Sequence, residues 1–260
     1  MARNKPSLLR PPFLKRVWID ETAVPPAKGY PFDLPMFANG FDVNFPTPVT
    51  IIVGENGTGK STFLEGLAGL IGFDQAGGGA GYRPVDHSGA VEVAGDVLRS
   101  VLRAGWLPKV STGWFFKAET FFSVARYLDD AARDASALPP DFLSHSHGEG
   151  FLRFFGERCL RRGIFLFDEP ESALSPTRQL EFLRLIADIE RAGTGQLIIA
   201  THAPLLMAYP NATLLETTRS GFRPIAFRET THYRVMEAFF RDPEDYLANA
   251  LSAQDPDRAP

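Results

Sequence analysis

The feature that most constrains this chain is an eight-residue segment, GENGTGKS, at residues 54–61. It has the form G-x-x-x-x-G-K-[ST] and follows Val49–Val53, an apolar run typical of a buried strand. A helical pattern follows it, Ser61–Ile71, with its apolar residues on one face. A strand, a glycine-rich turn and a helix in this order favour a phosphate-binding loop over a glycine turn without a ligand.

The residue types in this loop suit contact with the phosphates of a nucleotide. Glycines let successive backbone N–H groups point at phosphate oxygens, and the start of the helix adds partial positive charge. Lys60 supplies a point charge for the β- and γ-phosphates, and the Ser61 hydroxyl is a ligand for Mg²⁺. We therefore predict that ATP is bound by the loop residues Gly54, Glu55, Asn56, Gly57, Thr58, Gly59, Lys60, Ser61 and Thr62.

Two adjacent acids follow a second buried strand, Ile164–Phe167. In an open parallel sheet, ligands bind at the carboxyl ends of the strands. Asp168 would hold Mg²⁺ through its water shell, and Glu169 would orient or deprotonate the attacking water. The alternative is that both acids only cap the following segment. Tandem acids suit hydrolysis by water better than transfer to a substrate hydroxyl, which makes a kinase the less favoured class.

A histidine follows a third apolar strand, Leu197–Ala200. Its place at the ligand edge of the sheet favours contact between His202 and the γ-phosphate over a structural or surface role. The other histidines, His87, His145, His147 and His232, lack such a placement. A metal site at His145 and His147 is excluded because no cysteine or acidic residue stands at ligand spacing.

Together these segments resemble the ABC-type family of P-loop ATPases. Ser146-His147-Gly148-Glu149 is similar to the family's Ser-Gly-Gly-Gln signature, and it lies twenty-two residues before Asp168. The resemblance implies that the signature completes the ATP site of the opposite subunit, with ATP between two subunits of a head-to-tail homodimer. In detail the chain is similar to stand-alone AAA family ATPases with SHGES-like signatures, which are related to the RecF, Rad50 and SMC heads.

The chain also departs from the family pattern. Ser175 stands where the family's D-loop usually has an aspartate. Glu119 occupies the place of the Q-loop glutamine, where it would contact Mg²⁺ together with Ser61 and Asp168. Tyr30 and Phe32 are the candidates for the aromatic ring that stacks on adenine; we assign Phe32, with burial in the core as its alternative role.

The 260 residues predict one ABC-type α/β domain with a mostly parallel sheet. Antiparallel strands are expected to flank it at Phe13–Ile19 and Phe41–Phe45, between prolines. A helical subdomain is expected at approximately residues 85–150. A further helix is predicted at Pro176–Arg191, and a helix with a polar tail at residues 231–260, beginning near Tyr233.

Composition limits location and partners. A net charge of −4 gives no reason to expect strong nonspecific binding to nucleic acid. No apolar run reaches the roughly 18 to 20 residues that span a bilayer. Prolines interrupt the first sixteen residues and no long apolar core follows them, which argues against a secretory signal. We expect a cytoplasmic, Mg-dependent ATPase without direct membrane insertion, and an unidentified protein or nucleic-acid partner stays open.

Two other functions remain as alternatives. One is the ATP-binding subunit of a membrane transporter, although Phe151–Phe155 does not fit the polar residues that usually follow the signature there. The other is a nucleic-acid maintenance or defence ATPase. Rad50 and SMC heads interrupt the helical subdomain with long coiled coils, and this chain has no heptad pattern.

Overall fold

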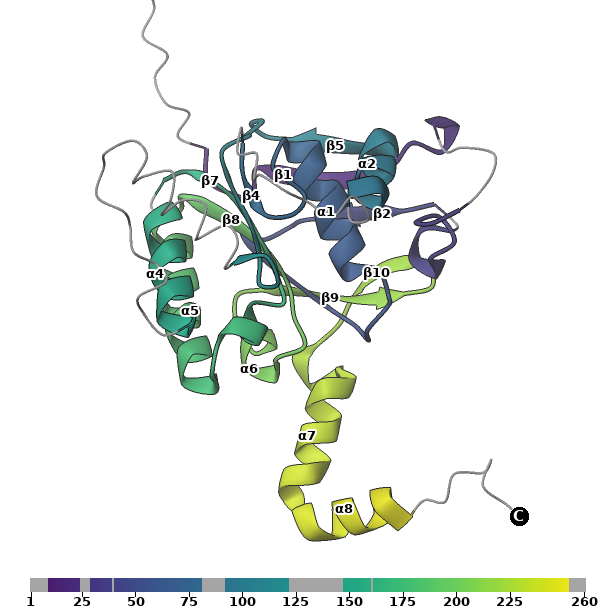
Figure 1. Ribbon diagram of the computed structural model, residues 1–260, viewed down its shortest axis with the longest axis vertical. Coiled ribbons are helices and arrows are strands. Elements are labelled where there is room, and N and C mark those ends of the chain that lie inside the picture. The colour runs from purple at the N-terminus through teal and green to yellow at the C-terminus, as the bar shows by residue number, and fades with distance from the viewer. Residues whose placement is uncertain are drawn as a thin grey trace, which may run out of the picture.

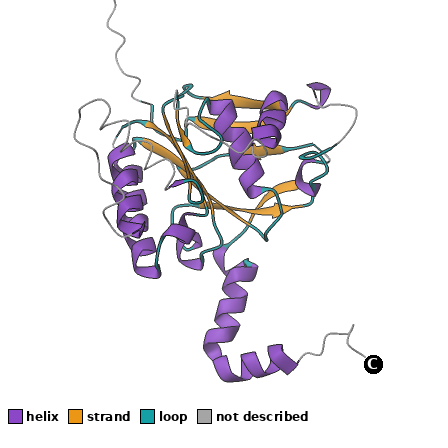
Figure 2. Cartoon of the chain, viewed as in Figure 1, coloured by secondary structure: helices purple, strands orange, loops and turns teal. Residues whose placement is uncertain are grey.

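The computed structural model describes residues 9–23, 29–38, 40–80, 92–121, 147–159 and 161–252. Over these ranges the chain forms two sheets, with helices between and outside them (Figures 1 and 2). No helix in the same ranges has both the length and the apolar character that crossing a membrane requires.

The larger sheet carries all three predicted buried strands at its centre. Its strands are β3 Val49–Val53, β4 Gly78–Gly79, β6 Gly113–Lys117, β7 Gly163–Asp168, β8 Gly195–Ala200, β9 Thr213–Thr218 and β10 Gly221–Pro224. They lie in the order β10-β9-β3-β8-β7-β6-β4, with parallel pairing from β9 to β6 and antiparallel pairing at both edges. Strands β3, β7 and β8 are buried at every residue because both faces of the parallel centre are covered.

A smaller antiparallel sheet confirms the predicted flanking strands. It consists of β1 Leu14–Ile19, β2 Asp42–Asn44 and β5 Leu102–Trp106, in the order β2-β1-β5. Gln196 of β8, which is fully buried, joins this sheet to the larger one. Its Oε1 accepts from the backbone N–H groups of Phe13 and Leu14, both at 2.8 Å, and its Nε2 donates to the Leu14 carbonyl. All polar atoms of this buried amide therefore have partners.

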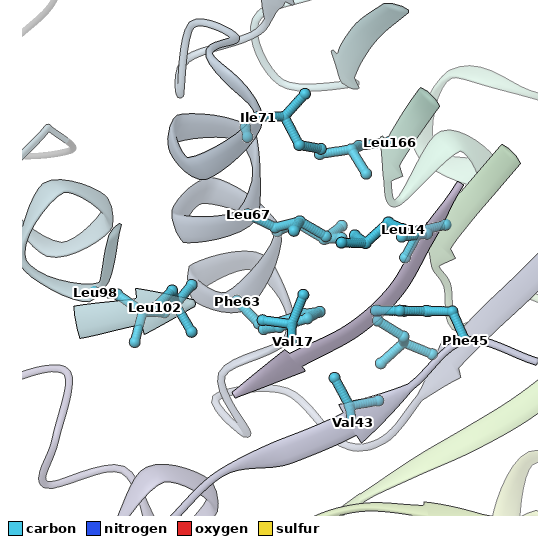
Figure 3. Packing of buried hydrophobic residues seen from close by; sticks show 14 of the residues in the cluster. Leu14, Val17, Val43, Phe45, Phe63, Leu67, Ile71, Leu98, Leu102 and Leu166 are labelled. Atoms are coloured by element: carbon cyan, nitrogen blue, oxygen red, sulfur yellow. The ribbon is translucent and has the colours of Figure 1, made fainter. Parts of the chain in front are cut away.

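The helix after the phosphate loop lies between the two sheets. This helix, α1 Lys60–Ile71, packs beside α2 Glu92–Val101. Figure 3 shows Phe63 and Leu67 of α1 directed toward Leu14 and Val17 of the small sheet. Leu166 of β7 belongs to the same apolar cluster. Burial on both sides of α1 holds the start of this helix, and so the loop before it, in a fixed place.

The other face of the large sheet is covered by α4 His147–Arg158, α5 Pro176–Ala192 and α6 Pro204–Met207. The contact is rich in aromatic rings. Phe116 of β6 stacks on Phe167 of β7 with ring centroids 4.6 Å apart, and Phe155 of α4 meets Phe167 edge-on. Edge-to-face and offset contacts of this kind add to the burial of apolar area. They anchor the helix that follows the predicted signature against the strand that carries the acidic pair.

The C-terminal part leaves the body of the molecule as two helices. They are α7 Thr231–Arg241 and α8 Pro243–Ser252, and they project away from the sheets (Figure 1). The predicted helix in this segment is confirmed, whereas α8 occupies part of the predicted polar tail. Several large apolar side chains of this arm are exposed: Val235, Met236, Phe240, Leu247 and Leu251. Four short 3₁₀ turns complete the described elements: η1 Glu21–Ala23, η2 Pro35–Phe37, η3 Pro170–Ala173 and η4 Phe227–Glu229.

The prediction of a helical subdomain at residues 85–150 is wrong in its middle part. Residues 102–117 form β5 and β6, which pair with β1 and β7. The aromatic run Trp114–Phe116 suits a strand, because its side chains alternate between the two covered faces of the sheet. The glycine-rich segment at 72–83 also contributes β4 to the sheet edge. Residues 122–146, where a further helix was expected, lie outside the described residues.

Candidate nucleotide-binding site

The loop at residues 54–59 connects β3 to α1 and opens onto a cleft of about 210 Å³. The cleft is lined by residues 56–62 together with Tyr30, Leu34 and Glu169. Gly57 and Gly59 have φ angles of 75° and 97°, a region that side chains with a Cβ rarely adopt. A Cβ on Gly59 would also lie 2.7 Å from the Met36 sulfur. These glycines therefore let the backbone line the cleft directly.

Lys60 begins α1 and is buried, with 4% of its surface exposed. Its Nζ donates to the carbonyls of Gly54 at 2.8 Å and Glu55 at 3.0 Å, so the ammonium group lies within the curve of the loop. Burial lowers the pKa of Lys60, while Glu169, Asp168 and other nearby carboxylates oppose this shift. A cation held beneath the loop in this way suits the β- and γ-phosphates of a nucleotide.

Ser61 and Asp168 place two oxygen ligands side by side at the edge of the cleft. The Ser61 Oγ donates to Asp168 Oδ1 at 3.0 Å, although the residues are 107 positions apart in the chain. Hard oxygen ligands fit Mg²⁺, which usually takes only one or two protein groups and completes its shell with phosphate and water. No cluster of three His, Cys, Asp or Glu side chains suited to a metal occurs among the described residues. Ser61 and Asp168 therefore fit Mg²⁺ bound together with a nucleotide.

Asp168 is 5% exposed, and its pKa is raised to about 7 by burial, against the opposing effect of Lys117. In the unfolded chain an aspartate has a pKa of about 3.9. The folded protein therefore keeps this proton to higher pH, and its unfolding free energy falls as the pH rises from about 4 to about 7.

We expect Asp168→Asn to stabilise the protein at pH 8, in the absence of nucleotide and Mg²⁺, by clearly more than at pH 5, where only about a third of the loss has occurred. Asparagine cannot ionise, so the loss on the order of 3 kcal/mol between these pH values should disappear. Urea unfolding at both pH values measures the difference. Asp188→Asn, at an exposed position of α5, is the matched control. An equal pH dependence in wild type and Asp168→Asn would contradict the assignment.

Glu169 follows directly, at the end of β7, with backbone angles φ 47° and ψ 53°. It is the one non-glycine residue with a positive φ among those described. Such a conformation costs about 1 to 3 kcal/mol and is concentrated at functional sites. It turns the Glu169 side chain into the cleft, where 43% of it is exposed. The carboxylate thus faces the phosphate loop while remaining open to water.

His202 follows β8, and its backbone is held by Glu171 of η3. Glu171 Oε1 accepts from the His202 N–H, and Oε2 accepts from the Thr201 hydroxyl at 2.8 Å. Burial raises the pKa of Glu171, an effect that these hydrogen bonds oppose. The His202 Nε2 lies 3.6 Å from Glu169 Oε1. The structure therefore brings together the acid and the histidine that the sequence places on different strands.

Replacing Thr201 with valine is expected to lower the unfolding free energy by about 1 to 3 kcal/mol. Thr201 is fully buried, and its hydroxyl both donates to Glu171 and accepts from the Ala203 N–H at 3.0 Å. Valine keeps the shape but leaves Glu171 Oε2 and the Ala203 N–H without their hydrogen bonds to this side chain. Chemical denaturation tests this, with the exposed Thr22→Val as the control. Equal losses in the two variants would contradict the role of the network.

The assignment of Phe32 as the ring that stacks on adenine is wrong. Phe32 is 3% exposed and belongs to the apolar cluster around α1, so its faces are already covered. Tyr30, two residues earlier, is 55% exposed and lines the cleft, and its hydroxyl lies 2.6 Å from Thr62 Oγ1. Tyr30 is therefore the candidate with a ring available to a nucleotide.

Glu119 is also placed differently from its prediction as a Mg²⁺ ligand. Its side chain is 81% exposed, and its carboxylate lies 3.8 Å from the Lys117 ammonium. Lys117, which is 9% exposed, lies in register with Asp168 at the end of β6 and pairs with Glu65 at 2.7 Å. The described contacts of Glu119 include neither Ser61 nor Asp168.

The predicted signature is only partly described. Ser146 lies outside the described residues. His147 and Gly148 form the first turn of α4, and their side-chain surroundings lie outside the description as well. Glu149 is 45% exposed and forms an ion pair with Arg178 of α5 at 2.5 Å. The role of these four residues in a second subunit stays a prediction.

Three residues at the site were not singled out by sequence reasoning. Lys117 could have been found, because it ends a strand at the ligand edge of the sheet. Glu171 carries no local signal, because its contact with His202 forms only where the loops after β7 and β8 meet. His232 was set aside, yet its Nε2 lies 3.1 Å from His202 Nδ1. No local pattern marks it, since it reaches the site from the start of α7.

Comparisons with known proteins show what the chain is similar to. A family model described as "AAA domain, putative AbiEii toxin, Type IV TA system" matches residues 119–208, and one described as "AAA domain" matches residues 34–92. The chain is 32% identical over 166 residues to the cytochrome c biogenesis ATP-binding export protein CcmA of Rhodopseudomonas palustris (strain BisB5), covering 60% of this chain and 79% of that protein.

A second relative is the hemin import ATP-binding protein HmuV of Nocardia farcinica. It is 28% identical over 182 residues, which cover 62% of this chain, and the chain spans only 60% of the length of that protein. Among solved structures, the SMC head domain from Thermotoga maritima covers 82% of this chain and 99% of its own, at 16% identity and a TM-score of 0.46. The sequence relationship to CcmA, together with the phosphate loop and the acidic strand end, shows that the chain belongs to the ABC-type family of P-loop ATPases.

Proposed function

We propose that this protein binds Mg-ATP in the cleft above residues 54–61 and hydrolyses it. One observation carries the proposal. The hydrogen-bonded pair Ser61 and Asp168 lies at the edge of the sheet where the phosphate loop opens, and the side chain of Glu169 lines the cleft there. The first two groups suit Mg²⁺, and the third suits water. Tyr30 is the proposed contact for the adenine ring.

Each group has a defined part in the proposed reaction. Bound Mg²⁺ would neutralise charge on the β- and γ-phosphates. Lys60 would share this role from beneath the loop, where its ammonium group already lies. Glu169 would orient the attacking water and accept its proton, and the His202 Nε2 would donate to a γ-phosphate oxygen. Water then attacks phosphorus in line with the leaving oxygen of ADP.

A second copy of the chain would complete this site. The described residues that line the cleft come from the loop, α1, the segment before β2 and the end of β7, and none comes from α4. We propose that the signature residues Ser146, His147, Gly148 and Glu149 act on the nucleotide of the partner, as the resemblance to the ABC-type family implies. The N-terminal end of α4 carries partial positive charge that suits the γ-phosphate.

Phosphate release by the purified chain tests this function. We expect release to require Mg²⁺, to fall in Ser61→Ala, and to increase per molecule as the protein concentration rises, because two copies share each site. Activity that is unchanged by removal of Mg²⁺ would contradict the roles of Ser61 and Asp168. Activity per molecule that is independent of concentration, down to the lowest measurable level, would contradict a dimer that forms on ATP binding.

The names of the curated relatives favour a second candidate, the ATP-binding subunit of a membrane transporter. Both the hemin import and the cytochrome c biogenesis export proteins are named as ATP-binding proteins of transport systems. Affinity purification of the full-length chain from detergent-solubilised membranes distinguishes the two. A stoichiometric membrane partner would favour the transporter subunit, and its absence would favour an independent ATPase.

A further inference from the structure

The contact between His202 and His232 connects the end of β8 with the first turn of α7. Thr230 begins this helix as its N-cap: it is 1% exposed, and its hydroxyl accepts from the Tyr233 N–H at 3.2 Å. This cap places the half-buried His232 so that its Nε2 lies 3.1 Å from the Nδ1 of His202. At this distance the two nitrogens form a hydrogen bond, in which one nitrogen carries the proton and donates and the other nitrogen accepts with its lone pair.

The second nitrogen of His202 decides which of them donates. His202 Nε2 is buried, has no hydrogen-bond partner among the described residues, and lies 3.6 Å from the Glu169 Oε1. A protonated nitrogen is attracted to this carboxylate, whereas a lone pair directed at it would be repelled. Neutral histidine carries one ring proton. The proton of His202 is therefore placed on Nε2, which leaves Nδ1 as the acceptor and makes His232 Nε2 the donor.

We propose that His232 is a positioning residue that holds His202 in its Nε2–H tautomer and directs that N–H toward the γ-phosphate. The proposal rests on the proposed function, because a γ-phosphate oxygen of bound ATP would be the acceptor that the buried His202 Nε2 lacks. In the other tautomer a lone pair would face the phosphate oxygens, and the contact would be repulsive. His232 acts only through His202 and does not touch the nucleotide itself. Its hydrogen bond to His202 also connects the first turn of α7 to the part of the site proposed to bind the γ-phosphate.

Two substitutions separate hydrogen bonding from packing. His232→Phe keeps a ring of similar size but removes the donor, and we expect it to lower kcat about tenfold with little change in KM for ATP. His232→Gln carries an amide N–H at nearly the position of the lost Nε2–H, and it should restore kcat to within about threefold of wild type. Arg234→Ala, an exposed change on the same helix, is the control.

The tautomer is measured directly by ¹⁵N-detected NMR of the histidine rings in the nucleotide-free protein. We expect His202 to carry its proton on Nε2 in wild type and in His232→Gln, and to populate both tautomers in His232→Phe. A proton on His202 Nδ1 in wild type would overturn the proposal. So would a wild-type kcat in His232→Phe, provided that the wild type hydrolyses ATP.

Failure of the proposal can be told apart from failure of the proposed function. If wild type releases no phosphate, the proposed function fails, while the nucleotide-free spectra still decide the tautomer. If wild type hydrolyses ATP and the spectra show Nδ1–H on His202, only the role of His232 is overturned. Equal kcat values in His232→Phe and His232→Gln, both reduced, would indicate a packing role and would also overturn it.

Discussion

Glu169→Gln is expected to lower ATP turnover by about 100- to 10,000-fold while ATP binding persists. Glutamine keeps the size of the side chain and can line the cleft in the same position at the end of β7, but it cannot accept a proton from water. The groups proposed to hold the phosphates, Lys60 and the backbone of the loop, are unchanged. Binding and catalysis should therefore separate in this variant.

Single-turnover phosphate release and equilibrium binding of a fluorescent ATP analogue measure the two effects. Glu157→Gln is the matched control, because Glu157 is a half-exposed glutamate of α4 that pairs with Arg153. A Glu169→Gln protein that hydrolyses ATP at the wild-type rate would exclude Glu169 as the group that activates water. Loss of binding together with turnover would instead indicate that this carboxylate supports the loop.

Lys60→Ala is expected to weaken ATP binding by about 30-fold or more. The ammonium group is buried and lies within hydrogen-bonding distance of two carbonyls of the loop, so a bound phosphate would meet it without a large movement. Alanine removes this charge, so only Mg²⁺ and the N–H groups of the loop would oppose the repulsion between the phosphates and the carboxylates of Glu169 and Asp168. Isothermal titration with Mg-ATP measures the change.

The control for this variant is Lys15→Ala, which removes an exposed lysine of β1. Its affinity for ATP should equal that of wild type. Near wild-type affinity in Lys60→Ala would mean that the cleft above the loop is not where the phosphates bind, and the proposed site would have to be abandoned.

Local patterns predicted the parts of the site that belong to one strand and its following loop. The GENGTGKS loop, the apolar strand before it and the helix after it lie where expected. Local steric limits on the backbone and the periodicity of apolar residues are enough to set these elements. Asp168, Glu169 and His202 were placed at one edge of the sheet, since the carboxyl ends of neighbouring parallel strands meet there.

The errors and omissions involve contacts between distant segments. His232 reaches His202 only because η4 and the Thr230 cap set the start of α7, which no sequence period describes. The Lys117–Glu65 pair joins the end of β6 to α1 across 52 positions of the chain. Phe32 and Tyr30 are both aromatic residues beside a proline, and only the packing around α1 decides which ring is covered. Tertiary contacts override local preference in each case.

The proposed reaction requires ATP to be held between two copies of the chain. The most direct test is the solution mass of the Glu169→Gln protein, measured by light scattering with and without Mg-ATP. We predict a monomer without nucleotide and a dimer with Mg-ATP, because the bound nucleotide would join the loop of one copy to the proposed signature of the other. A protein that binds Mg-ATP and keeps the mass of a monomer would contradict the shared site.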